Sequence, residues 1–125
     1  IQARGLADRV TIEAGSFFDR VPCGGDAYLL SHTIHDWTES QCLTILGHCR
    51  RAMTPGSRLL IIEMVLPSDN APHPGKMLDM MMLVGPGGQE RTESEYRELL
   101  GKAGFRLTRL VPTDTAVSVV EAVLT

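Results

Sequence analysis

Residues 49–66 read CRRAMTPGSRLLIIEMVL, and this stretch decides the fold class. From Arg58 to Leu66 it is mostly branched and apolar, which is the strongest strand signal in the chain. Pro55-Gly56 predicts the end of a helix before that strand. The helix is expected to follow Thr38, whose capping box with Gln41 is typical of a helix N-terminus. One apolar stripe has helical spacing: Cys42, Ile45, Leu46, Cys49, Ala52 and Met53.

The remaining segments extend this alternation of helices and strands. Strands are predicted at 9–14, 27–31, 58–66, 105–111 and 117–124, with 27–31 buried on both faces. The Met-rich segment 76–84 predicts a short helix that ends at the Gly/Pro-rich residues 85–88. Thr92 and Glu95 form a second capping box, and Gly104 is a natural residue to end the helix they open. The order predicts an α/β fold with helices on both faces of the sheet and an antiparallel pair of closing strands.

Composition and net charge limit the classes of protein to which this chain can belong. The chain has 125 residues, 43% of them apolar and a net charge of −3, which are ordinary values for one globular domain. That charge gives no reason to expect nucleic acid or an anionic membrane as a partner. No apolar run approaches the roughly 20 residues that cross a bilayer. Three cysteines without a zinc-type pair indicate buried free thiols in a cytoplasmic protein. Because the first residue is Ile1, we expect a part of a longer protein.

Acidic and basic side chains follow the strands at positions where a site is expected. His35-Asp36-Trp37 comes just after strand 27–31, Glu63 lies near the end of strand 58–66, and Glu90 follows the Gly-rich loop. In an open α/β sheet, ligands bind beyond the carboxyl ends of the parallel strands. A histidine there that is oriented by carboxylates is a general-base arrangement.

Each feature also has a structural interpretation. Glu63 is costly to bury without a partner, so it must have one or lie at the exposed end of its strand. Glu90-Arg91 could be a local ion pair. The methionines at 77 and 80–82 could be core residues or could line an adaptable apolar pocket. The residues by themselves predict an α/β enzyme with a histidine base, and they do not predict its reaction.

Three stretches and the closing strands resemble one family in order and spacing over almost the whole chain. They are GSFFDRVPCGGDAYLLSHTIHDW (15–37), CRRAMTPGSRLLIIEMVLP (49–67) and GGQERTESEYRELLGKAGF (87–105). The family is that of the S-adenosylmethionine (SAM)-dependent O-methyltransferases of the plant caffeate and bacterial polyketide-tailoring kind. The resemblance implies methyl transfer from SAM to a hydroxyl group of an aromatic or polyketide-like small molecule, with no metal.

The resemblance also implies roles for individual residues. His35 matches the catalytic base, and Glu63 and Glu90 match the carboxylates that orient it. Asp36 and Met81 match positions that line the acceptor pocket. A phenol, with a pKa of about 10, needs such a base at neutral pH, and an imidazole, with a pKa near 6.5, can take its proton.

The cofactor positions depart from the family pattern. Ser16 stands where the family often has an Asp that contacts adenine, and Ser31 stands where it often has a Lys that contacts SAM. Phe17 is retained as a candidate to stack on adenine. The two serines leave open a catalytically diverged module that serves as a binding or structural partner. A SAM-dependent tailoring enzyme with another reaction outcome, such as hydroxylation, also stays open.

The resemblance finally implies a domain organisation. Residues 1–125 match the C-terminal part of the catalytic domain, with a partial Rossmann-like sheet that lacks the first two strands. The family's Gly-rich SAM loop and its N-terminal dimerisation domain have no counterpart in these residues. We therefore expect a homodimeric parent, and an isolated chain that exposes core surface and is inactive.

Overall fold

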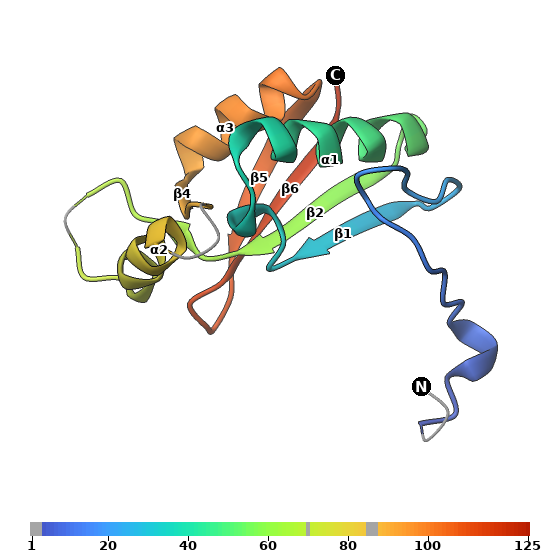
Figure 1. The fold of residues 1–125 in the computed structure, drawn as a ribbon, viewed down its shortest axis with the longest axis horizontal. Helices are drawn as coiled ribbons and strands as arrows, with labels where there is room; N and C mark the ends of the chain where they lie inside the picture. Colours follow the sequence, from blue (N-terminus) through green and yellow to red (C-terminus); the bar gives the residue numbers. More distant parts are fainter. Residues whose placement is uncertain (1–3, 70, 85–87) are drawn as a thin grey trace.

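Figure 1 shows the fold in a computed structural model, which describes residues 4–69, 71–84 and 88–125. Four longer strands form one sheet, and three α-helices accompany it. The strands are β1 (Ala27–Ser31), β2 (Arg58–Glu63), β5 (Phe105–Pro112) and β6 (Ser118–Leu124). The α-helices are α1 (Glu39–Ala52), α2 (Pro74–Val84) and α3 (Glu93–Lys102). Smaller elements are β3 (Val65–Leu66), β4 (Arg91–Thr92) and the 3-10 turns η2 (Ala7–Arg9) and η3 (Ile34–Asp36).

The sheet has the strand order β1-β2-β6-β5. β1 and β2 are parallel, with Leu29 opposite Leu60. β6 is antiparallel to both of its neighbours, β2 and β5. The predicted α/β class and the antiparallel closing pair are therefore confirmed. Because β1 and β2 are parallel, their carboxyl ends meet at one edge, where η3 and Glu63 lie.

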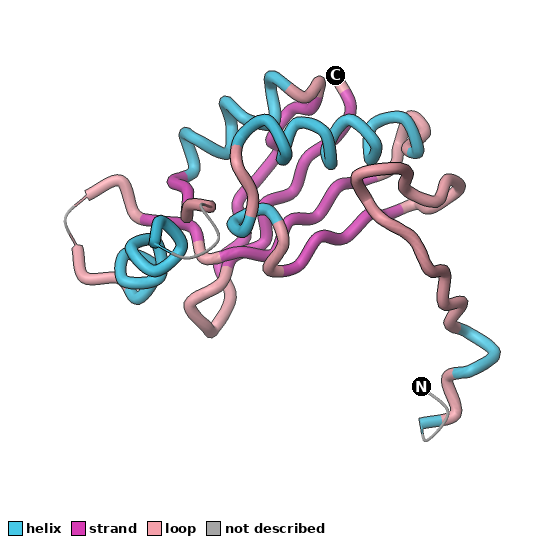
Figure 2. The backbone as a smooth tube through the Cα atoms, in the orientation of Figure 1, coloured by secondary structure: helices cyan, strands magenta, loops and turns pink. Residues whose placement is uncertain are grey.

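Helices α1 and α3 both lie on one face of the sheet (Figures 1 and 2). The alternating residues Leu59, Ile61 and Glu63 of β2 point to this face and are buried. The predicted apolar stripe of α1 packs against them, and its members Cys42, Ile45, Leu46 and Cys49 are 0–1% exposed. Burial of these side chains, each worth about 1.5–3 kcal/mol when apolar and large, forms the core.

The opposite face of the sheet is open among the described residues. Leu29 of β1 is 58% exposed, although it lies in the centre of its strand. The prediction that 27–31 is buried on both faces is thus wrong here, as is the prediction of helices on both faces. The physical reason is that no described helix packs on this side, so Leu29 keeps its contact with solvent.

Both predicted capping boxes are confirmed. The Thr38 N–H donates to Gln41 Oε1 at 3.1 Å, and the Thr92 N–H donates to Glu95 Oε2 at 2.7 Å. Gly104 ends α3 with a φ of +82°, a left-handed conformation that favours glycine.

Two predicted strands differ in the structure. Residues 9–14 form no strand, because no described strand lies beside them to accept their hydrogen bonds. The segment extends away from the sheet in Figure 1, and Ile12 is 81% exposed. Strand 58–66 is divided at Met64, where the chain leaves the main sheet. Its last two residues form β3, which pairs with β4.

The Met-rich segment forms α2 as predicted, but its methionines are not core residues. Met77, Met80 and Met81 are 60–65% exposed. The predicted break at 85–87 lies outside the described residues. Cys42 and Cys49 are buried as expected, whereas Cys23 is exposed, so the prediction of buried thiols fails there. Within residues 4–69, 71–84 and 88–125, every helix is too short or too polar to cross a membrane.

Candidate active site

The candidate base, His35, lies on the η3 turn that follows β1. The His32 N–H donates to Ile62 O at 3.1 Å, which extends the β1–β2 ladder by one residue. His32 then adopts a φ of +47°, and this sharp change of direction starts the turn. His35 is only 7% exposed, so its imidazole is buried at the edge of the sheet and is not solvated.

Two buried carboxylates face the same ring nitrogen of His35. Nδ1 lies 2.8 Å from Glu90 Oε1 and 3.2 Å from Glu63 Oε2. The side chains of both glutamates are 0% exposed. The three residues therefore come together as the strand order predicted. With its proton on Nδ1, the ring donates to a carboxylate and keeps the lone pair of Nε2 free.

Glu63 also holds the turn that carries His35. Its Oε1 accepts hydrogen bonds from the N–H groups of Thr33 and Ile34, each at 2.9 Å. These bonds account for a carboxylate inside an apolar strand, because a buried charge is tolerated when it is hydrogen-bonded. The expectation that Glu63 must have a partner is confirmed.

Glu90 is fixed by α2 and by the η3 turn. Its N–H donates to Asp79 Oδ1 at 2.8 Å, and the neighbouring Gln89 N–H donates to His35 O at 2.9 Å. Burial raises the pKa of the Glu90 carboxyl; His35 acts against this rise, while the negative charges of Glu63 and Asp79 add to it. The site therefore holds several acids close together around one imidazole.

Arg91 and Asp79 are two site residues that the sequence prediction missed. Arg91 does not form the local ion pair with Glu90 that was left open; its guanidinium donates to Ile34 O and Gln89 O. The signal for Asp79 was present, since it is an acid in the apolar run of 77–84. Asp79 is half-buried, and its carboxylate is met there by the Glu90 N–H.

The other side of the His35 ring is more open. Nε2 lies 3.3 Å from Asp36 Oδ1, and the Asp36 side chain is 41% exposed. Met81, the second residue predicted to line an acceptor pocket, is exposed on α2. Asp36 is thus next to Nε2 of the candidate base, whereas the structure gives Met81 no contact with it.

A cavity of about 270 Å³ contains two of the three predicted cofactor residues. Ser16 and Phe17 line it, together with Glu13, Ala14, Gly15, Arg20, Val21, Pro22 and Leu30. The apolar side chains suit a flat ring such as adenine. The Ser16 hydroxyl accepts the Phe18 N–H at 3.2 Å, so it also caps a local turn.

An aromatic cluster connects this cavity to the base. The rings of Phe17 and Trp37 have centroids 6.0 Å apart in an edge-to-face arrangement, and Trp37 lies two residues after His35. Ser31 does not line the cavity, although its neighbour Leu30 does. Ser31 is at the exposed end of β1, and its carbonyl accepts from Thr33 Oγ1 at 3.0 Å.

One group among the described residues has the spacing of a metal site. His32, His35 and Glu63 offer ligand atoms that lie within 4.8 Å of one another. Two of its three members are the candidate base and a carboxylate that faces it. A metal ion there would bind the same imidazole and the same Glu63 carboxylate that form the candidate base site.

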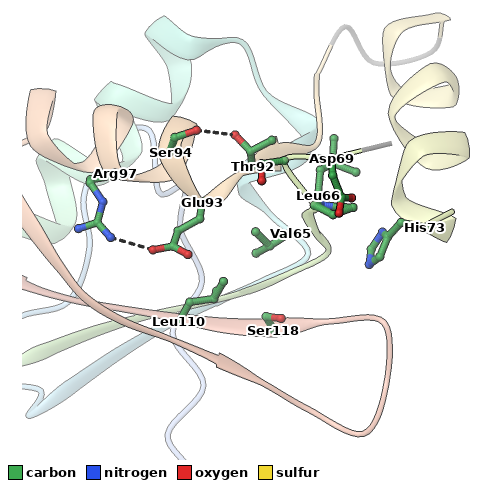
Figure 3. A pocket seen from close by; sticks show the side chains of 12 residues that line it. Val65, Leu66, Asp69, His73, Thr92, Glu93, Ser94, Arg97, Leu110 and Ser118 are labelled. Atoms are coloured by element: carbon green, nitrogen blue, oxygen red, sulfur yellow. Dashed lines mark hydrogen bonds and ion pairs between the residues drawn. The ribbon is translucent and has the colours of Figure 1, made fainter. Parts of the chain in front are cut away.

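A separate cavity of about 510 Å³ lies between β3, the start of α3 and the β5–β6 hairpin (Figure 3). Its polar side chains pair with one another: Arg97 with Glu93 at 2.8 Å, and Thr92 with Ser94 at 3.0 Å. His35, Glu63 and Glu90 do not line it. We therefore assign it no part in the chemistry.

The family model for the O-methyltransferase domain matches residues 2–106, which include the whole His35 site. The chain belongs to this O-methyltransferase family. Over 118 residues it is 47% identical to the phenazine O-methyltransferase PhzM of Lysobacter antibioticus, covering 94% of the chain and 35% of that protein. The chain thus spans about a third of the length of this relative.

Solved structures agree with this assignment. The crystal structure of LaPhzM superposes with a TM-score of 0.95 at 44% identity, over 99% of this chain and 37% of that one. An O-methyltransferase from neocarzinostatin biosynthesis, in complex with SAM and 2-hydroxy-5-methyl naphthoic acid, has a TM-score of 0.89 at 35% identity, over 99% and 36%. A relative with another activity is the aclacinomycin 10-hydroxylase RdmB of Streptomyces purpurascens, 42% identical over 105 residues, which are 82% of this chain and 28% of that protein.

Proposed function

We propose that the protein carrying this chain transfers a methyl group from SAM to a hydroxyl group of an aromatic or polyketide-like small molecule, with His35 as general base. One observation carries the proposal: Nδ1 of His35 lies within 3.2 Å of two buried carboxylates, and Nε2 is on the more open side. This arrangement leaves one nitrogen to accept a proton and gives the other a partner for the resulting positive charge.

His35, Glu90 and Glu63 would activate the hydroxyl group of the acceptor. Bound SAM would supply an electrophilic methyl group for the acceptor oxygen and, as the bond between that methyl group and sulfur breaks, would leave as S-adenosylhomocysteine. His35 takes the hydroxyl proton on Nε2, so that the oxygen gains nucleophilic character as its proton leaves. Glu90 and Glu63 stabilise the imidazolium through Nδ1–H. A positioned base of this kind contributes about 10²–10⁴-fold to rate.

Phe17 and Ser16 are the residues that would hold the adenine end of SAM, and Ser31 would contact it from the end of β1. The apolar cavity around Phe17 supports this part of the proposal. Asp36 and Met81 would line the acceptor pocket. One relative, a Streptomyces cremeus enzyme, is named for an aromatic acceptor, 3-amino-4-hydroxybenzoate, which supports an aromatic substrate for this protein.

We further propose that residues 1–125 form the C-terminal part of a larger catalytic domain in a dimeric, cytoplasmic protein. Two observations support the larger catalytic domain: the chain spans about a third of its relatives, and one face of its sheet is open. The 125 residues alone would then lack part of the SAM site and be inactive.

A second candidate function is SAM-dependent hydroxylation, which the 42% identity to a hydroxylase favours. The two reactions differ in product mass, because one adds a methyl group and the other adds oxygen. A module that binds without catalysis is the third candidate; it would give no product at all, although SAM could still bind.

The test incubates the protein carrying this chain with SAM and two probe acceptors, 3-amino-4-hydroxybenzoate and 1,4-dihydroxy-2-naphthoic acid, and identifies products by mass spectrometry. We expect methylated product that His35→Ala lowers by about 10²-fold or more and that His48→Ala, a matched change on α1, leaves unchanged. Excess EDTA should leave the rate unchanged. A His35→Ala variant with wild-type turnover would refute the base, and an oxygenated product would favour hydroxylation.

A further inference from the structure

Arg91 is a buried cation whose hydrogen bonds go to neutral groups. It is 2% exposed, and no described carboxylate forms an ion pair with it. A buried charge without a matched partner is costly, by several kcal/mol on general grounds. Because Arg91 has no ion pair with a described residue to stabilise it, its burial needs another explanation.

The guanidinium of Arg91 connects the segments that carry His35 and Glu90. Nη1 donates to Ile34 O at 3.3 Å and to Gln89 O at 3.2 Å. Ile34 directly precedes His35, and Gln89 directly precedes Glu90. One planar group thus fixes the separation of the two backbones from which the base and its carboxylate project.

The backbone of Arg91 reaches the third segment. In the β3–β4 ladder Arg91 pairs with Val65, which lies two residues after Glu63. The single residue Arg91 is therefore joined to the segment of Glu63 by strand pairing, to Glu90 by a peptide bond and to the His35 turn by its side chain.

Cys42 strengthens the same connection. Its thiol donates to Ile34 O at 3.3 Å, and Nη2 of Arg91 lies 3.8 Å from its sulfur. Burial raises the pKa of the Cys42 thiol, which keeps the S–H donor in place at neutral pH. The Ile34 carbonyl is consequently held by two donors, one from α1 and one from β4.

We propose that Arg91 is the positioning residue of the site: its guanidinium holds the His35 turn and the Glu90 segment at the separation that the Nδ1–Glu90 hydrogen bond requires. Its effect on turnover rests on the proposed function, whereas its effect on the His35 ring does not. Misplacement of a catalytic group by about 1 Å can cost about 10²-fold in rate.

The experiment compares Arg91→Met, Arg91→Lys and the control Arg97→Met in the protein carrying this chain. Arg97 is an exposed arginine on α3, paired with Glu93. Two readouts are used: kcat and KM with the probe acceptor that wild type methylates, and the imidazole nitrogen signals of His35 by NMR on histidine-labelled protein. The NMR signals report the proton on Nδ1 without any need for turnover.

We expect Arg91→Met to lower kcat by about 10–100-fold with little change in KM, and to shift the Nδ1 signal of His35. Arg91→Lys keeps the charge, but its ammonium ends one atom short of Nη1 and it has no counterpart of Nη2 to contact Cys42 Sγ, so we expect partial recovery only. Arg97→Met should match wild type in both readouts.

Some outcomes would overturn the proposal. An unchanged His35 signal in folded Arg91→Met, or wild-type kcat and signal in Arg91→Lys, would show that the guanidinium does not position the base. If Arg91→Met does not fold, Arg91→Lys decides by the same two readouts. If wild type methylates no acceptor while Arg91→Met still shifts the His35 signal, the proposed function fails and the positioning role stands.

Discussion

Glu90 Oε1 lies 2.8 Å from His35 Nδ1, although 55 positions separate the two residues along the chain. The contact forms because η3 begins where β1 ends and because segment 88–91 returns to the same edge of the sheet. Gln89 and Arg91 hold that segment to the turn through His35 O and Ile34 O. The geometry of the candidate base is thus a property of backbone placement as much as of the two side chains.

Glu63 has two separable roles, and two substitutions distinguish them. Glu63→Ala removes the acceptor of the Thr33 and Ile34 N–H groups, so we expect a loss of about 3 kcal/mol in the free energy of unfolding. Glu63→Gln keeps a carbonyl acceptor and should lose less than half of that, while its kcat falls because the negative charge is gone. Denaturant unfolding and turnover measure the two effects. Equal destabilisation by both substitutions would contradict this division.

The charge of Asp79 should affect the pH at which kcat falls on the acid side of the pH–rate profile. Burial raises the pKa of Glu90, and the charge of Asp79 adds to the rise. Less negative charge nearby lets the Glu90 carboxyl lose its proton at lower pH. Asp79→Asn keeps an oxygen for the Glu90 N–H but removes the charge. We therefore expect the acid limb of kcat to move to lower pH, and a shift toward higher pH would exclude this assignment.

Glu121 lies on the open face of the sheet, and its ionisation should make the free energy of unfolding depend on pH. Its carboxylate accepts from Arg109 at 3.0 Å and from Arg58 at 2.6 Å, and the hydrogen bond from Arg109 is the main cause of its lowered pKa. A lowered folded-state pKa gives stability that is present above the unfolded pKa of about 4.3 and is lost as pH falls through the folded pKa.

Thermal unfolding of Glu121→Gln tests this sign. Because both arginines are more than half exposed, solvent screening limits the expected loss to about 1 kcal/mol at neutral pH. The difference from wild type should vanish in strong acid, where wild-type Glu121 is also protonated. Glu93→Gln, which changes an exposed i,i+4 pair, should show little difference at either pH. A constant difference at all pH values would mean that charge is not the cause.

Local signals in the sequence predicted the local structure well. The capping boxes at Thr38 and Thr92 and the apolar stripe of α1 depend on neighbours within one or two turns, so their patterns carry the information. The site residues His35 and Glu63 were also predicted to meet, because the carboxyl ends of parallel strands lie at one edge. Glu90 was predicted to join them because it follows a flexible Gly-rich loop.

The features that were not predicted depend on partners far away in the chain. Residues 9–14 have a strand-like composition, but a strand needs a neighbour that is absent from the described residues. Leu29 is exposed for the same reason. Asp79 stands out as an acid in an apolar run, but neither it nor Arg91 could be given a partner, because spacing along the chain does not show which donor or acceptor meets a charged side chain.

Gly88 leaves no room for a side chain against the turn of the base. A Cβ added to it would lie 1.7 Å from His35 O, so that Gly88→Ala must push the backbone of segment 88–91 or of η3 aside. We expect a loss of about 1–3 kcal/mol in stability from such overpacking. We also expect kcat to fall by about tenfold or more, since the Glu90 contact moves with the segment.

The matched control is Gly101→Ala on α3, where an added Cβ meets no atom within 4 Å and a helix interior favours alanine. It should keep wild-type kcat and gain up to about 1 kcal/mol. Wild-type kcat in Gly88→Ala would show that the close contact with His35 O does not hold the base in place.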